Sequence, residues 1–338
     1  MGETLIYDDG VICAYAIATD GRAHSLDPDE LSAPIAQDSW IWVHFDVAGL
    51  NTRQWLEQES GLDGHAVDAL LAEETRPRAT TTSHGSLVIL RGVNLHPDSD
   101  PTDMISVRLW IEPNRIISTR IRPLLSVTAI RERCDANDAP RSVGEFVVDL
   151  NNGLIERMSG VINSLDEEID EIEKASIDEI PSVVRPKLVN ARQKIIPLRR
   201  FLSPQRDAIS QLMASKVEWL AEWQRGQLRE CADRLTRYVE ELDAMREKAS
   251  VIQDTVATQL AETMNRNMLV LSVVAAIFLP LGLLTGLLGI NVDGIPGSQE
   301  APAAFWIVVA ILVAITAFEV WLFHRMGLIL WGGRRRLK

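Results

Sequence analysis

The stretch "MLVLSVVAAIFLPLGLLTGLL" (residues 268–288) decides the fold class, because its 21 residues include no ionisable group. About 20 apolar residues in a helix cross the hydrocarbon core of a bilayer. A second run of the same length, residues 303–323, carries one charge, Glu319, near its end. The sequence therefore predicts a membrane protein with two spans at the C-terminal end, which follow about 265 residues of soluble character.

The distribution of Lys and Arg predicts the orientation of these spans. The segment between them has no Lys or Arg but contains Asp293 and Glu300. The basic residues that flank the spans are Arg266, Arg325, Arg334, Arg335, Arg336 and Lys338. Because cytoplasmic flanks carry the excess of Lys and Arg, we expect a multi-pass protein of the cell's inner (plasma) membrane with both termini in the cytoplasm. The first 21 residues have no basic segment followed by an apolar core, so no signal peptide is expected.

Composition narrows the function classes. The net charge of −13 argues against nucleic acid as a partner, and it fits either a cation partner or an ordinary acidic surface. The three cysteines, Cys13, Cys134 and Cys231, form no C-x-x-C pair, which predicts no structural zinc site. The six histidines, at 24, 44, 65, 84, 96 and 324, show no metal-ligand spacing. No nucleotide-binding or hydrolase motif is present, so neither an enzyme nor a bound cofactor is expected.

Residues 1–140 have the mixed periodicity of a cytoplasmic α/β domain. Five short runs are β-rich or alternate in polarity: "VICAYAIA", "WIWVHF", "SLVILRGV", "MISVRLWIE" and "RIISTR". Two patches, "NTRQWLEQES" and "GHAVDALLAEE", have helical spacing. This alternation predicts the α/β class but does not predict the order of the strands.

Residues 141–221 read as antiparallel cytoplasmic helices. The first is amphipathic from residue 145 to about 176. Pro186 suits the first turn of the next helix, which runs to about residue 215. A bend or break is expected at Pro197 and Pro204. The acidic run "DEEIDEIEK" (166–174) lies in the first helix and is either a solvated face or a surface that attracts cations.

Residues 222–288 are expected to form one helix that starts in the cytoplasm and ends as the first span. No Gly or Pro occurs from residue 227 to residue 279. Such a helix is about 100 Å long, too long for one small domain to cover, so it needs partners, most simply copies of itself. An external loop (289–302), the second span (303–324) and a basic cytoplasmic tail (325–338) complete the layout.

One line of residues along this helix is small or polar within the span. Counted at alternating spacings of four and three, the line contains Asp254, Thr258, Ala261, Asn265, Met268, Ser272, Ala275, Leu279, Gly282 and Gly286. Small side chains at a repeat of 3.5 residues suit parallel helices that surround a narrow path. Gly282 and Gly286 also form a G-x-x-x-G pair, which equally suits close packing of a transmembrane dimer.

The layout resembles that of the CorA superfamily of divalent-cation transporters over the whole chain. A G-x-N motif ends the first span, where the family's usual Gly-Met-Asn reads Gly289-Ile290-Asn291, and "DGIPG" follows it. With "EETRPRAT", "SPQRD" and "CADRL", these letters are similar to the ZntB branch, which is associated with zinc.

The resemblance implies a homopentamer in the lipid bilayer, with the first spans around a central pore and the second spans outside them. It implies uptake of Zn²⁺ and leaves proton coupling open, with Mg²⁺, Co²⁺, Ni²⁺ and Cd²⁺ as other candidate ions. By position, Asn291 stands at the external mouth. Gly289 lets the backbone leave the helix, and Asp293 belongs to a ring of external charge.

The chemistry of the stripe predicts how an ion would pass. Within the membrane it offers hydroxyls, a thioether and backbone carbonyls, without the Cys, His or carboxylate ligands that bound zinc prefers. Magnesium gives up its water reluctantly. We therefore expect a largely hydrated cation, with the Asn291 amide holding the metal through water. Two alternatives stay open: a magnesium and cobalt channel of the same family, and a two-span coiled-coil sensor or tether.

Overall fold

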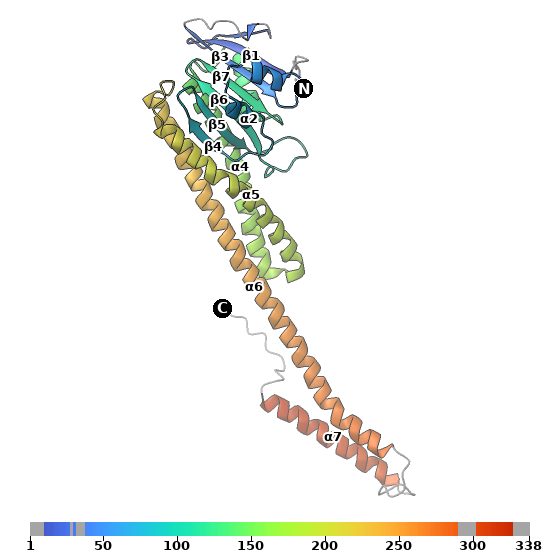
Figure 1. Ribbon diagram of the computed structural model, residues 1–338. Coiled ribbons are helices and arrows are strands. Elements are labelled where there is room, and N and C mark those ends of the chain that lie inside the picture. Colours follow the sequence, from blue (N-terminus) through green and yellow to red (C-terminus); the bar gives the residue numbers. More distant parts are fainter. Residues whose placement is uncertain (1–9, 28–29, 32–37, 290–301, 327–338) are drawn as a thin grey trace. The chain divides into compact units, whose positions relative to one another are not determined.

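The computed structural model describes residues 10–27, 30–31, 38–289 and 302–326. It divides into two compact units, Met1–Gln253 and Asp254–Lys338. The first unit contains a β-sheet with its covering helices, and the second contains the apolar end of helix α6 together with helix α7 (Figure 1).

The strands of the first unit form a single seven-stranded sheet in the order β2-β1-β3-β7-β6-β5-β4 (Figure 1). Their bounds are Val11–Ala18 (β1), Ala23–Ser25 (β2), Ser39–Asp46 (β3), Arg78–Thr81 (β4), Ser86–Gly92 (β5), Ile105–Glu112 (β6) and Arg115–Arg120 (β7). The central pair, β3 and β7, is parallel, and every other pair of neighbours is antiparallel. The five strands that the sequence predicts are β1, β3, β5, β6 and β7, and the two short edge strands were not predicted.

Helices cover both faces of this sheet. The helices of the first unit are Thr52–Gln58 (α1), Gly64–Leu71 (α2), Leu125–Asp135 (α3), Val143–Asp178 (α4), Pro181–Ala214 (α5) and the first part of Glu222–Leu288 (α6). On one face, Val43 and Phe45 of β3 pack in a buried cluster with Leu56 of α1 and Leu70 of α2. Burial on both faces explains why β3 reads as a nearly continuous apolar run.

The opposite face of the sheet carries an aromatic core. Phe146 of α4 lies 4.9 Å from Trp42 and 5.9 Å from Trp40, measured between ring centroids. Tyr15 of β1 stacks on Trp42 and donates its hydroxyl to Asp135 of α3 at 2.6 Å. Burial and this hydrogen bond raise the pKa of Tyr15, so it stays a neutral donor. These contacts fix α3 and α4 on the sheet.

Helix α5 corrects two predictions about proline. The helix begins at Pro181, after an extended Ile180, so Pro181 takes the first helical position and Pro186 lies inside the helix. Of the bend or break expected at Pro197 and Pro204, the break does not occur, because α5 continues to Ala214. Its buried apolar residues recur at helical spacing on both sides of these prolines, and this packing outweighs the hydrogen bonds that the prolines remove.

The apolar segments form helices of spanning length. Helix α6 has 67 residues and α7, Pro302–Arg325, has 24. Both are long and apolar enough to cross a membrane. A mixed α/β unit followed by a long helix that continues into an apolar one confirms the predicted fold class.

Candidate ion pathway along α6

The part of α6 in the first unit has one buried face. Leu228, Leu235, Leu242 and Ala249 recur every seven positions, and each is 0 % exposed, as is Cys231 beside them. This spacing places an apolar stripe along one side of the helix, where it packs in the α/β unit. The other side of the helix remains open in a single chain.

Because one face of α6 is buried and the other is exposed, two nearby substitutions should lower the free energy of unfolding by different amounts. Leu235→Ala leaves a cavity in a fully buried stripe and should lower the free energy of unfolding by about 2–5 kcal/mol. Arg237→Ala, on the exposed side two residues away, should change it by no more than about 0.5 kcal/mol. Thermal unfolding of the two purified variants measures the difference, and equal losses would contradict the assignment of the faces.

All ten residues of the predicted stripe lie on α6 and are exposed in the single chain. They are Asp254, Thr258, Ala261, Asn265, Met268, Ser272, Ala275, Leu279, Gly282 and Gly286. The residues of the span that are half-buried include Val273, Ile277, Leu281 and Leu284. At 3.6 residues per turn, their mean direction lies roughly 170° from that of the stripe within the span. The stripe therefore lies within the exposed surface of the span, on the side opposite its half-buried residues.

The stripe's two glycines are not required by packing inside the chain. A Cβ atom added at Gly282 or Gly286 would meet no heavy atom within 4 Å among the described residues. A glycine in the interior of a helix costs roughly 0.8–1 kcal/mol relative to alanine. No packing within the chain explains why this face carries glycine in place of larger side chains. Such a face is suited to the close approach of other copies, whether around a path or in a dimer.

The same spacing continues toward the N-terminus into the first unit. The added positions are Glu230, Asp233, Arg237, Glu240, Ala244, Glu247 and Val251, and all are exposed. Within the first unit they lie roughly 180° from the buried stripe of α6. Extending the spacing below Asp254 would have found them. With Asp254, this surface carries five carboxylates and one guanidinium in each chain.

The G-x-N motif is only partly within the described residues. The Gly289 N–H donates to the Thr285 carbonyl at 2.9 Å, so helical hydrogen bonding persists one residue beyond the end of α6. Ile290, Asn291 and Asp293 lie outside the described residues. Gly289 lies seven residues beyond Gly282 and thus continues the spacing of the stripe.

Groups that could bind a metal directly are not clustered in the described part of the chain, where no three His, Cys, Asp or Glu side chains come together. His44 is fully buried and its Nδ1 lies 2.8 Å from the Ser118 hydroxyl. Burial lowers the pKa of His44 to about 3, so it stays neutral. The exposed surface of α6 thus offers carboxylates, hydroxyls and carbonyls that can attract or pass a hydrated ion.

The acidic run of α4 is partly committed to ion pairs. Lys248 of α6 lies 2.5 Å from Asp170 and 2.7 Å from Glu173, and Lys194 of α5 lies 2.7 Å from Glu168. The Lys248 ammonium holds the pKa of Asp170 below its usual range. These carboxylates link α4 to its neighbouring helices, so the run is neither a fully solvated face nor a free cation-attracting surface.

Glu319 lies on a partly covered side of α7. It is half-buried on α7, in line with the half-buried Leu312, Thr316 and Phe323. Its Oε2 atom is buried and has no hydrogen-bond partner among the described residues. A carboxyl group in an apolar helix is costly and is usually functional.

The fold and this surface together define a class of protein. A mixed α/β unit leads into a very long helix and two apolar segments of spanning length, with a continuous exposed stripe on the long helix, as in a membrane transporter. The chain belongs to the CorA-like Mg²⁺ transporter family, whose profile matches residues 37–325. Members of this family transport ions, which confirms the predictions that the chain is a CorA-type transporter and not an enzyme.

Individual relatives agree over nearly the full length. The "Divalent cation transporter CmaX" of Pseudomonas aeruginosa is 36 % identical over 320 residues, which cover 94 % of this chain and 96 % of the relative. The "Zinc transport protein ZntB" of Yersinia enterocolitica is 30 % identical over 324 residues, with coverages of 96 % and 97 %. The solved structure of a full-length CmaX protein matches with a TM-score of 0.80 at 34 % identity and covers 94 % of this chain and 98 % of that one.

Proposed function

We propose that this divalent cation transporter is a homopentamer of the inner membrane, in which the α6 stripes of five chains line a central path. Both termini lie in the cytoplasm. The observation that carries the proposal is the exposure of all ten stripe residues on the side away from the covered face of the span. Five copies around an axis place this face inward, where small side chains leave room for an ion.

The ion passes largely hydrated. The stripe within the span presents Met268, Ser272, Ala275, Leu279, Gly282 and Gly286, none of which can replace the whole hydration shell of a divalent cation. At the external mouth, the Asn291 amides hold the metal through its water, and Asp293 contributes to a ring of negative charge. Below the membrane, the five carboxylates of each exposed α6 surface raise the local concentration of cations.

Zinc is the cation that we assign to this path. The Yersinia relative carries the name of a zinc transport protein, and Ile290 stands where the magnesium members of the family carry Met. A relative with higher identity is named only as a divalent cation transporter, so a magnesium and cobalt channel remains the alternative. A dimeric tether is no longer an alternative, because the chain belongs to a family of transporters.

The assignment is tested by metal flux into proteoliposomes that contain the purified protein. Zinc should enter faster than magnesium, and an imposed pH gradient should change the rate of zinc entry. Faster magnesium entry would favour the alternative channel, and zinc entry that ignores the gradient would remove proton coupling. Native mass measurement in detergent should give five copies, and two copies would contradict the pentamer.

Glu319 is the group to which we assign the coupling to protons. Its carboxyl oxygen is buried without a described partner in an apolar helix, and carboxyl groups inside membrane segments commonly belong to proton relays. Glu319→Gln keeps the shape of the side chain and removes the carboxyl group. We expect zinc flux that no longer responds to the pH gradient, while Thr316→Val, one turn earlier, keeps the response. Unchanged gradient dependence in Glu319→Gln would contradict the role.

A further inference from the structure

A pocket of about 590 Å³ lies in the α/β unit and takes no part in the proposed ion path. Its walls come from residues 74–76 after α2, residues 100–104 before β6, Arg91 of β5, and residues 197–201 of α5. Three arginines line it: Arg76, Arg91 and Arg200. Its size is within the range of pockets that hold small organic ligands.

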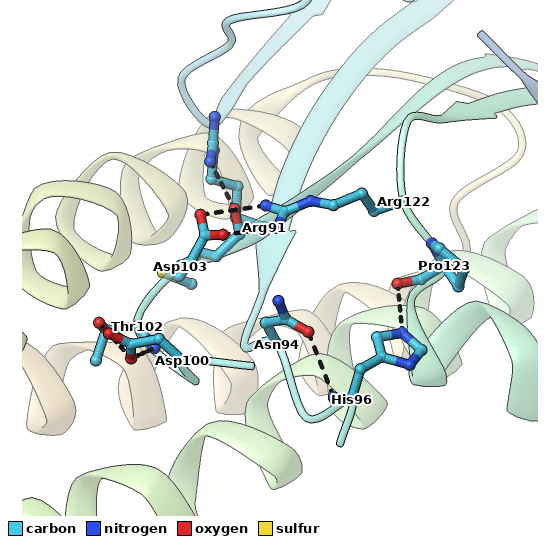
Figure 2. A network of polar contacts seen from close by, with 9 residues as sticks. Arg91, Asn94, His96, Asp100, Thr102, Asp103, Arg122 and Pro123 are labelled. Carbon is cyan, nitrogen blue, oxygen red and sulfur yellow. Dashed lines mark hydrogen bonds and ion pairs between the residues drawn. The ribbon is translucent and has the colours of Figure 1, made fainter. Parts of the chain in front are cut away.

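Arg91 is held in place by neutral groups only. Figure 2 shows Arg91 beside Asp103 and Arg122. The Nη1 of Arg91 donates to the Met104 carbonyl at 2.7 Å, and its Nε and Nη2 donate to the Thr75 carbonyl at 3.2 and 2.8 Å. The guanidinium also lies over the Phe201 ring, 4.1 Å from the centroid. Among the described residues it has no ion pair. Carbonyls and an aromatic face fix its orientation but leave its charge uncompensated.

The acidic residues of the pocket are mostly occupied. Asp103 accepts two hydrogen bonds from the Arg122 guanidinium, at 2.6 and 3.2 Å (Figure 2). This pair holds the pKa of Asp103 below its usual range. Asp100 accepts from the backbone N–H and the hydroxyl of Thr102, both at 2.8 Å. Glu74 is exposed to solvent. When Arg122 is counted with the three arginines of the lining, four guanidinium groups oppose the three carboxylates Glu74, Asp100 and Asp103, a surplus of one positive charge.

A buried hydroxyl completes the lining. Thr75 is 8 % exposed, and its Oγ1 atom has no hydrogen-bond partner among the described residues. Burying a hydroxyl without a partner costs free energy. A ligand with acceptor oxygens would supply the missing bond beside the Arg91 guanidinium.

We propose that this pocket binds a small organic molecule through its phosphate group, which Arg76, Arg91, Arg200 and the Thr75 hydroxyl hold. Planar guanidinium groups match the oxygens of a phosphate and form charge-assisted hydrogen bonds with them. The remaining volume accommodates the organic part. Two segments singled out in the sequence meet here: "EETRPRAT" provides residues 74–76, and Gln205 of "SPQRD" accepts the Arg91 backbone N–H at 2.7 Å. The ligand would thereby join α5 to the sheet.

Calorimetric titration of the full-length protein in detergent tests this site, with glycerol 3-phosphate, adenosine monophosphate and inorganic phosphate as probes. At least one of the two esters should bind more tightly than inorganic phosphate. Arg200→Gln should weaken that binding at least about tenfold, because one charged hydrogen-bonding group is lost. Thr75→Val should weaken it severalfold without lowering the melting temperature, since its hydroxyl has no described partner.

Arg185→Gln is the matched control, because Arg185 is an exposed arginine on the same helix, roughly 22 Å along it from Arg200. It should bind the ester as the wild type does. Absence of binding by both esters would overturn the proposal, as would equal effects of Arg185→Gln and Arg200→Gln. Tighter binding of inorganic phosphate than of either ester would contradict the proposal that the ligand has an organic part. Each readout is independent of transport, so the binding proposal can be contradicted without any consequence for the proposed ion path.

Discussion

Asn291→Ala is expected to abolish zinc uptake and to leave the pentamer intact. Asn291 lies two residues beyond Gly289 in the sequence, and we propose that its amide belongs to the external mouth of the path. Alanine cannot hold the water of a hydrated cation, and a polar ring at the entrance of a narrow path controls what enters. Uptake into proteoliposomes should fall to the level of empty vesicles, while the size of the complex in detergent is unchanged.

The matched control for this substitution is Asn267→Ala. Asn267 is an exposed asparagine of α6 that lies off the stripe, between Asn265 and Met268 by sequence and on another side of the helix. Its uptake should equal that of the wild type. Near-normal uptake in Asn291→Ala would remove the amide from the mechanism, and a smaller complex would mean that Asn291 acts through assembly.

Gly282→Leu should close the path. In a single chain a Cβ atom added at this position meets no heavy atom within 4 Å among the described residues, and leucine favours the helix more than glycine does. The chain should therefore fold as before. Five leucine side chains around one axis would fill a path that glycine leaves open. Uptake should fall at least tenfold, with a smaller loss in Gly282→Ala, and Val313→Leu on α7 should have no effect.

The same substitution distinguishes a path from a packing contact. If Gly282 and Gly286 only let two helices approach each other, Gly282→Leu would separate the copies. The complex would then become smaller in detergent. A pentamer of unchanged size that no longer takes up zinc supports the path, whereas a loss of assembly contradicts it.

Local patterns in the sequence were sufficient for much of the fold. The five predicted strands match β1, β3, β5, β6 and β7 closely, because each carries a continuous or alternating apolar run bounded by turn residues. Helix α3 was missed because "LSVTAIRERCD" mixes charged and apolar residues without a clear face. The start of α5 was placed late because two prolines, Pro181 and Pro186, both fit a first turn, and only the extended Ile180 decides between them.

The candidate sites also differ in how far the sequence alone predicts them. The stripe on α6 depends on spacing along one helix, so sequence alone predicts it, and continuing the count would have reached Glu230. The environment of Glu319 depends on how α7 is rotated about its axis, which the uniformly apolar composition of that helix does not specify. The arginine pocket joins residues 75, 91 and 200 through the topology of the sheet and α5. No local pattern contains that information.

The central claim is that the exposed stripe of α6 lines the path, and a scan of uptake along the span tests it most directly. Each residue from 271 to 282 is replaced singly by tryptophan, which is larger than every residue in this stretch, and zinc uptake is measured in proteoliposomes that contain complexes of verified size. We expect strong loss at Ser272, Ala275, Leu279 and Gly282 and little loss at the positions between them. Losses spread evenly along the span, or greatest at Val273 and Ile277, would contradict it.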